Sequence, residues 1–500
     1  MLMNGYELIA IGLYMALMIG IGIYSWRKSN CNSDDFLIGG RKMGAAVTAL
    51  SAGAADMSGW LLMGLPGAMY LSGLSSAWIA IGLTIGAYLN YVLVAPRLRV
   101  YTEVAQNAIT LPVFFENRFK DKTQLLKIVS SIFILVFFTL YTSAGMVSGG
   151  RLFESAFGMD YYTGLFATTF VVVLYTFLGG FLAVSLTDFV QGTIMVTALV
   201  IIPVVLVIQI GGLGTTLDII ASKGSNYLDL FKGTTTISIV SLLAWGLGYF
   251  GQPHILVRFM AIGDVKDIPK AKKIGISWMI LTVGGALLLG LFGIAYLYKF
   301  DPATMLQFDQ SKELSETIFI HLSRTLFHPL IGGFLLSAIL AAVMSTISSQ
   351  LLVTSSSMTE DIYKAFFNKN ASAKRMLLVS RISVLIVAIV ALLLSLNPKD
   401  SILNLVGNAW AGFGAAFGPL IILSLLWKRT TATAGLLGML VGGATVLLWV
   451  YVPHDYKYVY EIIPGFILSF ITTVVVSLLS KPVDSEIQNE FDQVKEILKS

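Results

Sequence analysis

Two glycine-rich stretches decide the fold: AGAADMSGW at residues 52–60 and WGLGYFGQP at residues 245–253. Each lies inside a long apolar run, where glycine and proline weaken or break a helix. Within a membrane protein, interrupted helices at corresponding places in two halves of a chain indicate a transporter's binding site. The alternative is that glycine only lets helices pack closely. That alternative explains a single stretch better than it explains a matched pair.

The composition places the chain in a membrane. Of its 500 residues, 56% are hydrophobic and 12% are charged, and the mean hydropathy is +0.81. Soluble domains carry about 25% charged residues, so a soluble protein is excluded. Apolar runs of about twenty residues are long enough to cross a bilayer. They predict thirteen transmembrane helices near residues 6–26, 43–72, 76–96, 126–148, 161–181, 188–211, 235–257, 274–298, 331–358, 376–397, 402–427, 432–453 and 458–480.

Positive charges orient the predicted helices. The loops that follow odd-numbered spans, together with the tail, hold 24 lysines and arginines, whereas the loops on the opposite side hold 8. Because cytoplasmic loops carry the excess of these residues, we expect an external N-terminus and a cytoplasmic C-terminus in a multi-pass protein of the cell membrane. The net charge of +5 therefore reflects topology, and no nucleic-acid partner is predicted.

Ten of the thirteen predicted spans divide into two units of five, residues 43–211 and 235–427. Because five crossings end on the side opposite their start, the second unit is inverted relative to the first. The predicted fold is therefore an all-α membrane protein with an inverted five-plus-five core. The other parts are an accessory first helix and cytoplasmic loop (1–42), an external loop (212–234), two accessory helices (428–480) and a cytoplasmic tail (481–500), polar enough for a short amphipathic helix.

A cation site is predicted where Asp56 meets a second polar group. A charge at the centre of a membrane helix costs at least about 2.5–3.5 kcal/mol, so Asp56 either caps freed amides or supplies negative charge near a cation, the preferred interpretation. Ala342, Ser345 and Thr346 are spaced i, i+3, i+4 and share one helix face. Two hydroxyls and the carbonyls of a broken helix suit a hard cation. With so little charge, the set fits Na⁺ better than Ca²⁺.

Aromatic side chains at the second interruption are candidates for the walls of a pocket. Trp245, Tyr249 and Phe250 lie beside glycines there, and Tyr141 in the fourth span offers a hydroxyl. In a chain with 12% aromatic residues, each of them taken alone is explained as well by packing. Only the position beside the break raises Trp245 and Tyr249 above that background.

Other ionisable residues in the spans are given more ordinary interpretations. Asp188 is expected at the cytoplasmic edge of the sixth span, where helix capping is an equal alternative to a functional role. Arg381 is expected to extend to the membrane interface. His254 and Arg258, at the end of the seventh span, are expected at the interface too.

Several other classes of function lack the residues they need. One cysteine, Cys31, excludes an internal disulfide, and the four histidines lack zinc-ligand spacing. An enzyme is not predicted, because the spans contain no nucleophile–base pair. The absence of a GxxxxGK[ST] motif disfavours ATP-driven pumping. A membrane sensor with a transporter-like core is the alternative from another class, although the short tail leaves little room for a signalling domain. We expect no cofactor and no obligate protein partner.

Longer strings around these positions resemble the sodium/solute symporter family, and within it the bacterial sodium/proline symporters. The similarity extends from about residue 6 to residue 480. It implies thirteen helices in a leucine-transporter-type fold. The strings are ALSAG (49–53), DMSGWLLMGLPG (56–67), WGLGYFGQPH (245–254), AAVMST (341–346) and NAWAGFGAAFGP (408–419).

The resemblance also implies roles for particular residues. Sodium would be bound by the carbonyls of Ala54, Met57 and Ala342 and the hydroxyls of Ser345 and Thr346. Support of the sodium site or coupling would involve Asp56, Arg41 and Asp188. Positions linked to proline would be Ser58, Gly59, Tyr141, Trp245, Tyr249 and Pro253.

The function that follows from the resemblance is sodium-coupled uptake of L-proline by alternating access, with one Na⁺ per proline. Half-helix amides suit the carboxylate of proline, and aromatic faces suit its ring and ammonium. A sugar needs several amide or carboxyl partners, and only Gln252 and Asp56 lie near the breaks. Sodium symport of another small monocarboxylate, such as pantothenate, is the alternative within the same class.

Overall fold

The chain folds into helices throughout. The computed structural model describes residues 4–28, 33–224, 226–397, 402–453 and 455–499, so Cys31 lies outside the described part. Within it, the extended backbone pairs only at one isolated bridge, between Met43 and Ile262. The helical elements are α1 (Gly5–Lys28), α2 (Ser33–Ile38), η1 (Gly39–Arg41), α3 (Ala45–Asp56), η2 (Trp60–Gly64), α4 (Leu65–Ser72), η3 (Gly73–Ser76), α5 (Ala77–Leu89), η4 (Asn90–Val94), α6 (Ala95–Val104), α7 (Leu111–Phe119), α8 (Leu125–Phe157), α9 (Tyr161–Ile210), α10 (Leu213–Lys223), α11 (Thr236–Leu243), η5 (Ala244–Gly251), α12 (Pro253–Ala261), η6 (Val265–Asp267), α13 (Ile268–Phe300), α14 (Pro302–Gln310), α15 (Lys312–Ser315), α16 (Ile318–Leu326), α17 (Pro329–Ser356), η7 (Ser357–Phe367), α18 (Ala373–Leu394), α19 (Ile402–Leu426), α20 (Ala432–Tyr451), α21 (Ile462–Leu479) and α22 (Ser485–Ile497).

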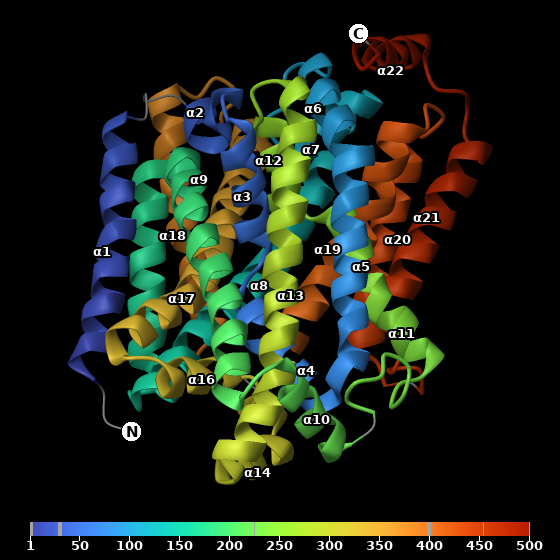
Figure 1. Ribbon diagram of the computed structural model, residues 1–500. Coiled ribbons are helices and arrows are strands. Elements are labelled where there is room, and N and C mark those ends of the chain that lie inside the picture. Colours follow the sequence, from blue (N-terminus) through green and yellow to red (C-terminus); the bar gives the residue numbers. More distant parts are fainter. Residues whose placement is uncertain (1–3, 29–32, 225, 398–401, 454, 500) are drawn as a thin grey trace.

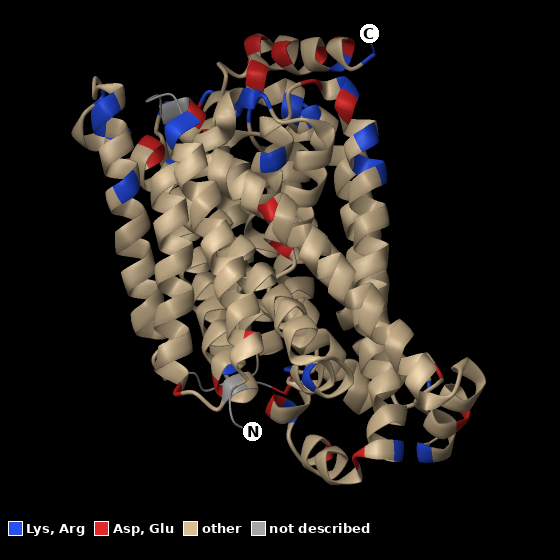
Figure 2. Ribbon diagram, turned by 60° about the vertical axis from the view of Figure 1, so that its left-hand side comes forward, with Lys and Arg blue, Asp and Glu red and all other residues tan. Residues whose placement is uncertain are grey.

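Long apolar helices run between two ends of the molecule (Figure 1). In the described residues, ten helical stretches are long and apolar enough to span a membrane. The C-terminus and α22 lie at one end, called here the α22 face, and α10, α14 and the N-terminus lie at the other, the α14 face. Lysines and arginines gather mostly at the α22 face (Figure 2). The prediction of an all-α membrane protein is confirmed.

The longest helix, α9, bends back at Gly180. Its fifty residues would extend about 75 Å if straight, more than twice the roughly 30 Å of a bilayer's hydrocarbon core. Gly180 has φ 53° and ψ −143°, and a Cβ there would lie 2.4 Å from the Phe36 ring. Arg381 donates hydrogen bonds to the carbonyls of Phe177 and Leu178 beside the break. Arg381 therefore stabilises the bend rather than simply reaching for the membrane interface.

The two arms of α9 correspond to the predicted spans 161–181 and 188–211. In Figure 1 the first arm rises to the α22 face and the second returns. Trp278, early in α13, donates to the Gly192 carbonyl, and Lys299, near its end, donates to the Ile210 carbonyl. The second arm thus runs parallel to α13 over its length. The predicted turn at 182–187 is helical instead, because the reversal is concentrated at a single glycine.

Both glycine-rich stretches break their helices, as predicted. α3 ends at Asp56, and Met57 leaves the helical range with φ −81° and ψ 80°. The chain then resumes as the π-helical η2 and α4. In the second stretch α11 passes into the 3₁₀-helical η5, Gln252 is extended with φ −83° and ψ 106°, and α12 begins at Pro253. Each break exposes backbone groups that no helix satisfies.

Glycine also serves close packing at the second break. A Cβ on Gly82 or on Gly86 of α5 would lie 2.3 or 2.2 Å from the carbonyl oxygens of Leu243 and Gly246, respectively. α5 and η5 therefore meet backbone to backbone. Helix interruption and close helix packing therefore both apply to the second glycine-rich stretch, which breaks its helix and also packs closely against α5.

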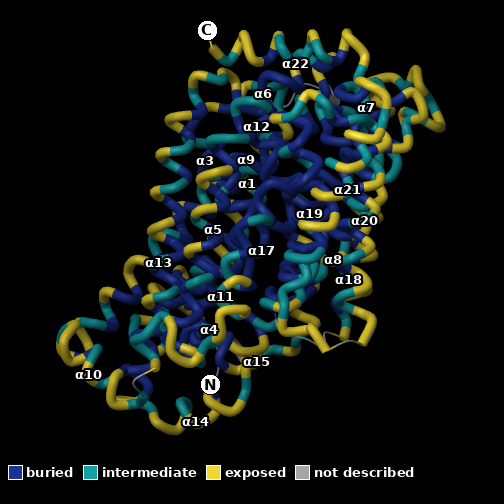
Figure 3. Tube along the Cα trace, turned by 90° about the vertical axis from the view of Figure 1, so that its right-hand side faces the viewer, coloured by how far each residue is buried: buried dark blue, intermediate teal, exposed yellow. Residues whose placement is uncertain are grey.

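The polar tail forms the amphipathic helix that its composition predicts. Phe491 of α22 packs edge-on against Tyr101 at a centroid distance of 6.3 Å, and Lys120, directly after α7, pairs with Glu486 and Glu490 at 3.3 and 2.5 Å. Partial burial opposes the charge of Lys120, but the hydrogen bonds that its ammonium donates to these glutamates outweigh that effect and raise the pKa of Lys120. Figure 3 shows α22 lying across one end of a bundle whose middle is buried.

Candidate functional site

The predicted sodium residues meet where α17 passes the end of α3. The Ser345 hydroxyl donates to the carbonyls of Ala54 and Ala342 at 2.7 and 3.1 Å, and the Thr346 hydroxyl donates to the Ala342 carbonyl at 3.1 Å. All four residues are buried. The contact from Ser345 to Ala54 joins the broken helix to α17. Two carbonyls and two hydroxyls thus form one oxygen cluster, the ligand chemistry of a hard cation.

Met57 stands slightly apart from this cluster. It follows the end of α3, and its amide donates to the Gly53 carbonyl at 3.0 Å. Among the described residues, no hydrogen bond joins Met57 to α17. Four of the five predicted sodium residues are therefore linked directly, and Met57 lies one turn along the chain from Gly53.

The Asp56 carboxylate faces the second broken helix. The Tyr249 hydroxyl donates to Asp56 Oδ2, and Asp56 Oδ1 has no hydrogen-bond partner among the described residues. In the described part of the chain the carboxylate accepts no hydrogen bond from a backbone amide, so the interpretation of Asp56 as a helix cap is wrong there. It lines a cavity of about 30 Å³ with Asn90, Tyr249 and Met279. That volume suits a water or an ion and is too small for an amino acid.

Aromatic side chains enclose the second break. Trp245 stacks on Tyr460 with a centroid distance of 5.1 Å and an angle of 19°, and it lies 6.5 Å from Trp60 of the first break. Trp410 donates to the Trp245 carbonyl at 2.8 Å and contacts Tyr249 edge-on at 5.2 Å. The predicted residues Trp245 and Tyr249 therefore do share one aromatic group. Trp410 and Tyr460 were not among the predicted residues.

The remaining predicted proline positions are spread over a longer path. The buried hydroxyls of Ser58 and Tyr141 lie near each other, and neither has a well-formed hydrogen bond. Gly59 is packed against α8, since a Cβ there would lie 2.5 Å from the Ser148 hydroxyl. Pro253 lines a separate cavity nearer the α22 face. The structure thus places Ser58, Gly59 and Tyr141 at the first break and Pro253 beyond it.

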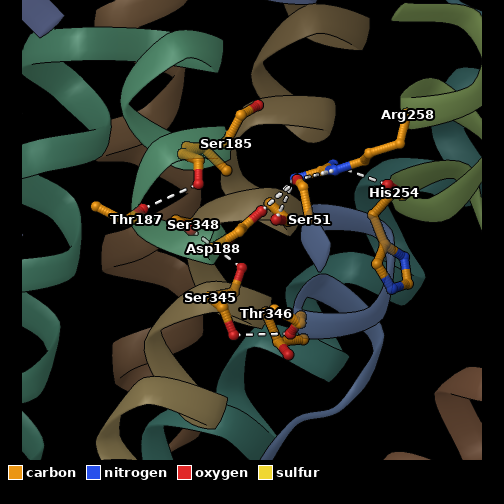
Figure 4. A network of polar contacts seen from close by, with 12 residues as sticks. Ser51, Ser185, Thr187, Asp188, His254, Arg258, Ser345, Thr346 and Ser348 are labelled. Carbon is orange, nitrogen blue, oxygen red and sulfur yellow. Dashed lines mark hydrogen bonds and ion pairs between the residues drawn. The ribbon is translucent and has the colours of Figure 1, made fainter. Parts of the chain in front are cut away.

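A second polar group is centred on a buried ion pair (Figure 4). Asp188 Oδ2 accepts hydrogen bonds from Ser51 at 2.6 Å and from Arg258 at 3.2 Å. Arg258 also donates to the Ser349 hydroxyl at 2.5 Å and to the His254 carbonyl at 2.7 Å. The network connects α3, α9, α12 and α17, the same helices that surround the sodium residues.

The positions predicted for three of these residues are wrong. Asp188, His254 and Arg258 are fully buried rather than at an edge or an interface. Asp188 lies two turns past the bend at Gly180, inside a continuous helix, so it caps nothing. The break at Gln252 redirects α12 into the protein, which carries Arg258 inward. Opposite charges in two separate spans are the sequence signal that would have paired them.

Arg41 lies far from the oxygen cluster, at the α22 face. Its guanidinium donates to Asn107 at 2.9 Å, to Thr102 at 3.1 Å and to the carbonyls of Met260 and Ala108 at 2.6 and 2.7 Å. These bonds connect η1 with α6, with α12 and with the segment between α6 and α7. Arg41 can therefore influence the central site through these elements.

A membrane-embedded bundle with two broken helices, the first of which meets an oxygen cluster on α17, is the architecture of a secondary transporter. The chain belongs to the sodium:solute symporter family, whose model matches residues 36–442, and is a multi-pass protein of the cell membrane. It is 57% identical to the osmoregulated proline transporter OpuE of Bacillus subtilis over 98% of both chains. It is 52% identical to a sodium/proline symporter of Staphylococcus aureus over 99% of this chain and 97% of that one.

Solved structures of other transporters have the same fold as this chain. A Na⁺-coupled sialic acid symporter in a substrate-bound, outward-open state has a TM-score of 0.82 at 18% identity, covering 96% of this chain and 99% of that chain. MHP1, a nucleobase-cation-symport-1 family transporter in a closed conformation, has a TM-score of 0.54 at 13% identity, covering 91% and 98%. The leucine-transporter-type fold predicted from the sequence is confirmed.

Proposed function

We propose that this protein takes up L-proline across the cell membrane by sodium-coupled alternating access, with one Na⁺ per proline. The observation that carries the proposal is the oxygen cluster joining Ala54 at the first break to Ser345 on α17. The names of the two relatives, a proline transporter and a sodium/proline symporter, supply the substrate. One convincing oxygen cluster supports one coupling ion.

The proposed sodium ligands are the oxygens of the cluster together with the Met57 carbonyl. The hydroxyls of Ser345 and Thr346 donate hydrogen bonds to the carbonyls of Ala54 and Ala342, respectively. A cation entering between these oxygens replaces the donated protons, because each hydroxyl keeps its own lone pairs for coordination. Asp56, with one unpaired carboxylate oxygen beside the cluster, adds negative charge without direct coordination. Arg41 and Asp188 support coupling from outside the cluster.

The proposed substrate residues are Ser58, Gly59, Tyr141, Trp245, Tyr249 and Pro253. The flat faces of Trp245 and Tyr249 suit the ring of proline, and their π-electrons suit its ammonium. The broken helices offer free amides to its carboxylate. The cavity beside Asp56 and Tyr249 is too small for proline, so substrate entry requires the two broken helices to separate.

The finer topology belongs to the same proposal. We infer thirteen crossings, with residues 43–211 and 235–427 as inverted repeats of five, an external N-terminus and a cytoplasmic C-terminus. Residues 1–42, 212–234, 428–480 and 481–500 are the accessory first helix, external loop, accessory helices and tail. Opposite ends for the N- and C-termini (Figure 1) and the cations at the α22 face (Figure 2) support this orientation.

Purified protein in liposomes tests the substrate. We expect an inward sodium gradient to drive accumulation of radiolabelled proline, since the proposed sodium and proline sites both include residues of the first broken helix. Unlabelled proline and compact analogues that keep its ring and carboxylate should compete, and glucose should not. Trp245→Ala should raise the KM for proline about tenfold with little change in sodium dependence.

The matched control is Trp26→Ala, because Trp26 is 52% exposed on α1, away from the site, and its loss should leave both constants unchanged. Uptake of pantothenate that excess proline fails to displace would contradict the proline assignment and leave sodium symport standing.

A further inference from the structure

Two cavities lie on either side of one short segment at the α22 face. The inner cavity is lined by Thr110, Pro253, Val257, Val353 and Ser356 among others. The outer groove is lined by Gln106, Asn107, Lys127, Glu360, Lys364 and their neighbours. Ile109 lines both. The segment 105–110, between α6 and α7, is therefore the wall that separates them.

The inner cavity lies between the candidate site and the α22 face. Pro253 begins α12, directly after the second break. On α17, Val353 lies seven residues, or two helical turns, beyond Thr346. On α8, Ile134 stands the same distance from Tyr141 and also lines the cavity. A molecule leaving the site toward the α22 face along these helices reaches the wall next.

The backbone of the wall is irregular and strained. Gln106 and Asn107 have φ values of 57° and 54°, in the left-handed region that residues other than glycine rarely adopt. Such conformations persist where the surrounding contacts enforce them, and they cluster in parts of proteins that switch between states. The first part of the wall is the C-terminal turn of α6, because the amides of Ala105 and Ala108 donate to the carbonyls of Tyr101 and Thr102 at 2.7 and 2.8 Å.

Besides these backbone bonds and a bond from Asn117 to the Ala105 carbonyl at 3.0 Å, two side-chain contacts join the wall to more distant elements. Arg41 donates to the Asn107 side chain at 2.9 Å and to the Ala108 carbonyl at 2.7 Å. At the other end of the wall, Thr110 donates to Asp361 Oδ1 at 2.7 Å. Asp361 is fully buried, and its Oδ2 has no hydrogen-bond partner in the described part of the chain. The Thr110 bond is thus the charge-assisted contact of a buried carboxylate.

Each contact is anchored to a helix that carries part of the candidate site. Asp361 belongs to η7, which continues α17 without a break from the oxygen cluster. Arg41 also bonds the Met260 carbonyl of α12, the helix that begins at the second break. A shift of either helix when its site empties is therefore transmitted to the wall.

We propose that the segment 105–110 is the gate through which the transported solute leaves on the α22 face, and that Thr110 and Asp361 form its latch, with Arg41 as a second anchor. This proposal rests on the proposed function for the direction of transport. The gate also explains how Arg41 acts on coupling from a distance. Without the bonds from Arg41 to the wall, the gate opens before both sodium and solute are bound.

Cysteine accessibility tests the gate. Replacing the single cysteine, Cys31→Ser, gives a background in which Val353→Cys reports from the inner cavity and Lys369→Cys from the outer groove. A charged, impermeant methanethiosulfonate is added from the α22 side of vesicles. In the parent, we expect Val353→Cys to react at least about tenfold more slowly than Lys369→Cys. Adding Thr110→Val should accelerate the Val353→Cys reaction about tenfold and leave the Lys369→Cys rate unchanged.

Three further variants separate the latch from general loosening. Thr110 also caps α7 through the Val113 amide, so Thr110→Ser, which keeps both bonds, should behave like the parent. Thr431→Val removes a comparable capping threonine, that of α20, and should not open the inner cavity. Asp361→Asn weakens the latch without touching the cap and should accelerate the Val353→Cys reaction.

The outcomes are separable from those of the substrate assay, because modification of Val353→Cys needs no proline transport. Equal Val353→Cys rates in the parent, Thr110→Val and Asp361→Asn proteins would overturn the latch. Reaction of Val353→Cys only from the α14 side would overturn the gate.

Discussion

Arg258→Met is expected to lower the stability of the folded protein by about 3–5 kcal/mol, the cost of removing one partner of a buried ion pair. Arg258 and Asp188 are both fully buried, and without the guanidinium the Asp188 carboxylate is left with Ser51 alone. Asp188→Leu should be similarly harmful, because it leaves Arg258 unpaired. Thermal unfolding of the purified protein in detergent measures both effects as a fall in Tm.

The double variant Asp188→Leu with Arg258→Met should recover much of the lost stability, since no buried charge then remains. An exposed pair provides the control: Lys232 and Asp229 lie 3.9 Å apart with side chains 62% and 35% exposed. Lys232→Met should cost less than about 1 kcal/mol. A double variant no more stable than either single one would show that the hydroxyl contacts, rather than the charges, stabilise this region.

Ser345→Ala and Thr346→Ala are each expected to raise the sodium concentration for half-maximal uptake by about tenfold, or roughly 1.4 kcal/mol of lost sodium binding. Each variant removes one hydroxyl from the oxygen cluster and leaves a good helix former in its place. Asp56→Asn should act in the same direction, because it keeps the size of the side chain and removes its charge. Uptake measured against sodium concentration gives these constants.

The same helix offers a matched control. Ser337 is also fully buried on α17, and its hydroxyl bonds only to the Gly333 carbonyl one turn earlier. Ser337→Ala removes a similar bond away from the cluster and should leave sodium dependence unchanged. Normal transport by Ser345→Ala and Thr346→Ala at low sodium would refute the proposed ligands, and normal transport by Asp56→Asn would restrict Asp56 to a structural role with Tyr249.

Features determined by local sequence could be predicted well. The breaks at Asp56 and Gln252 follow from glycine and proline in apolar helices, and the shared face of Ser345 and Thr346 follows from helical spacing. The bond from the Ser345 hydroxyl to the Ala54 carbonyl agrees with the predicted pairing of a broken helix with α17. These inferences succeed because they depend on a few residues within one or two turns.

Features that depend on packing between distant segments could not be predicted. Asp188 and Arg258 are 70 residues apart, and although their opposite charges are a signal for pairing, local sequence does not bring the two spans together. Trp410 and Tyr460 join the aromatic group because α19 and the start of α21 pack against η5. The wall at Gln106 and Asn107 has no apolar periodicity to mark it, so its place beside two cavities emerges only from the folded structure.

The flux ratio of sodium to proline tests the central claim most directly. Proteoliposomes held at a known membrane potential, with opposing sodium and proline gradients, show no net flux where the driving forces balance. One charge across about 100 mV contributes roughly 2.3 kcal/mol, and a tenfold sodium gradient about 1.4 kcal/mol. With one Na⁺ per proline, these forces should balance a roughly 500-fold proline gradient. Balance at the gradient for two charges, or accumulation without sodium, would contradict the account.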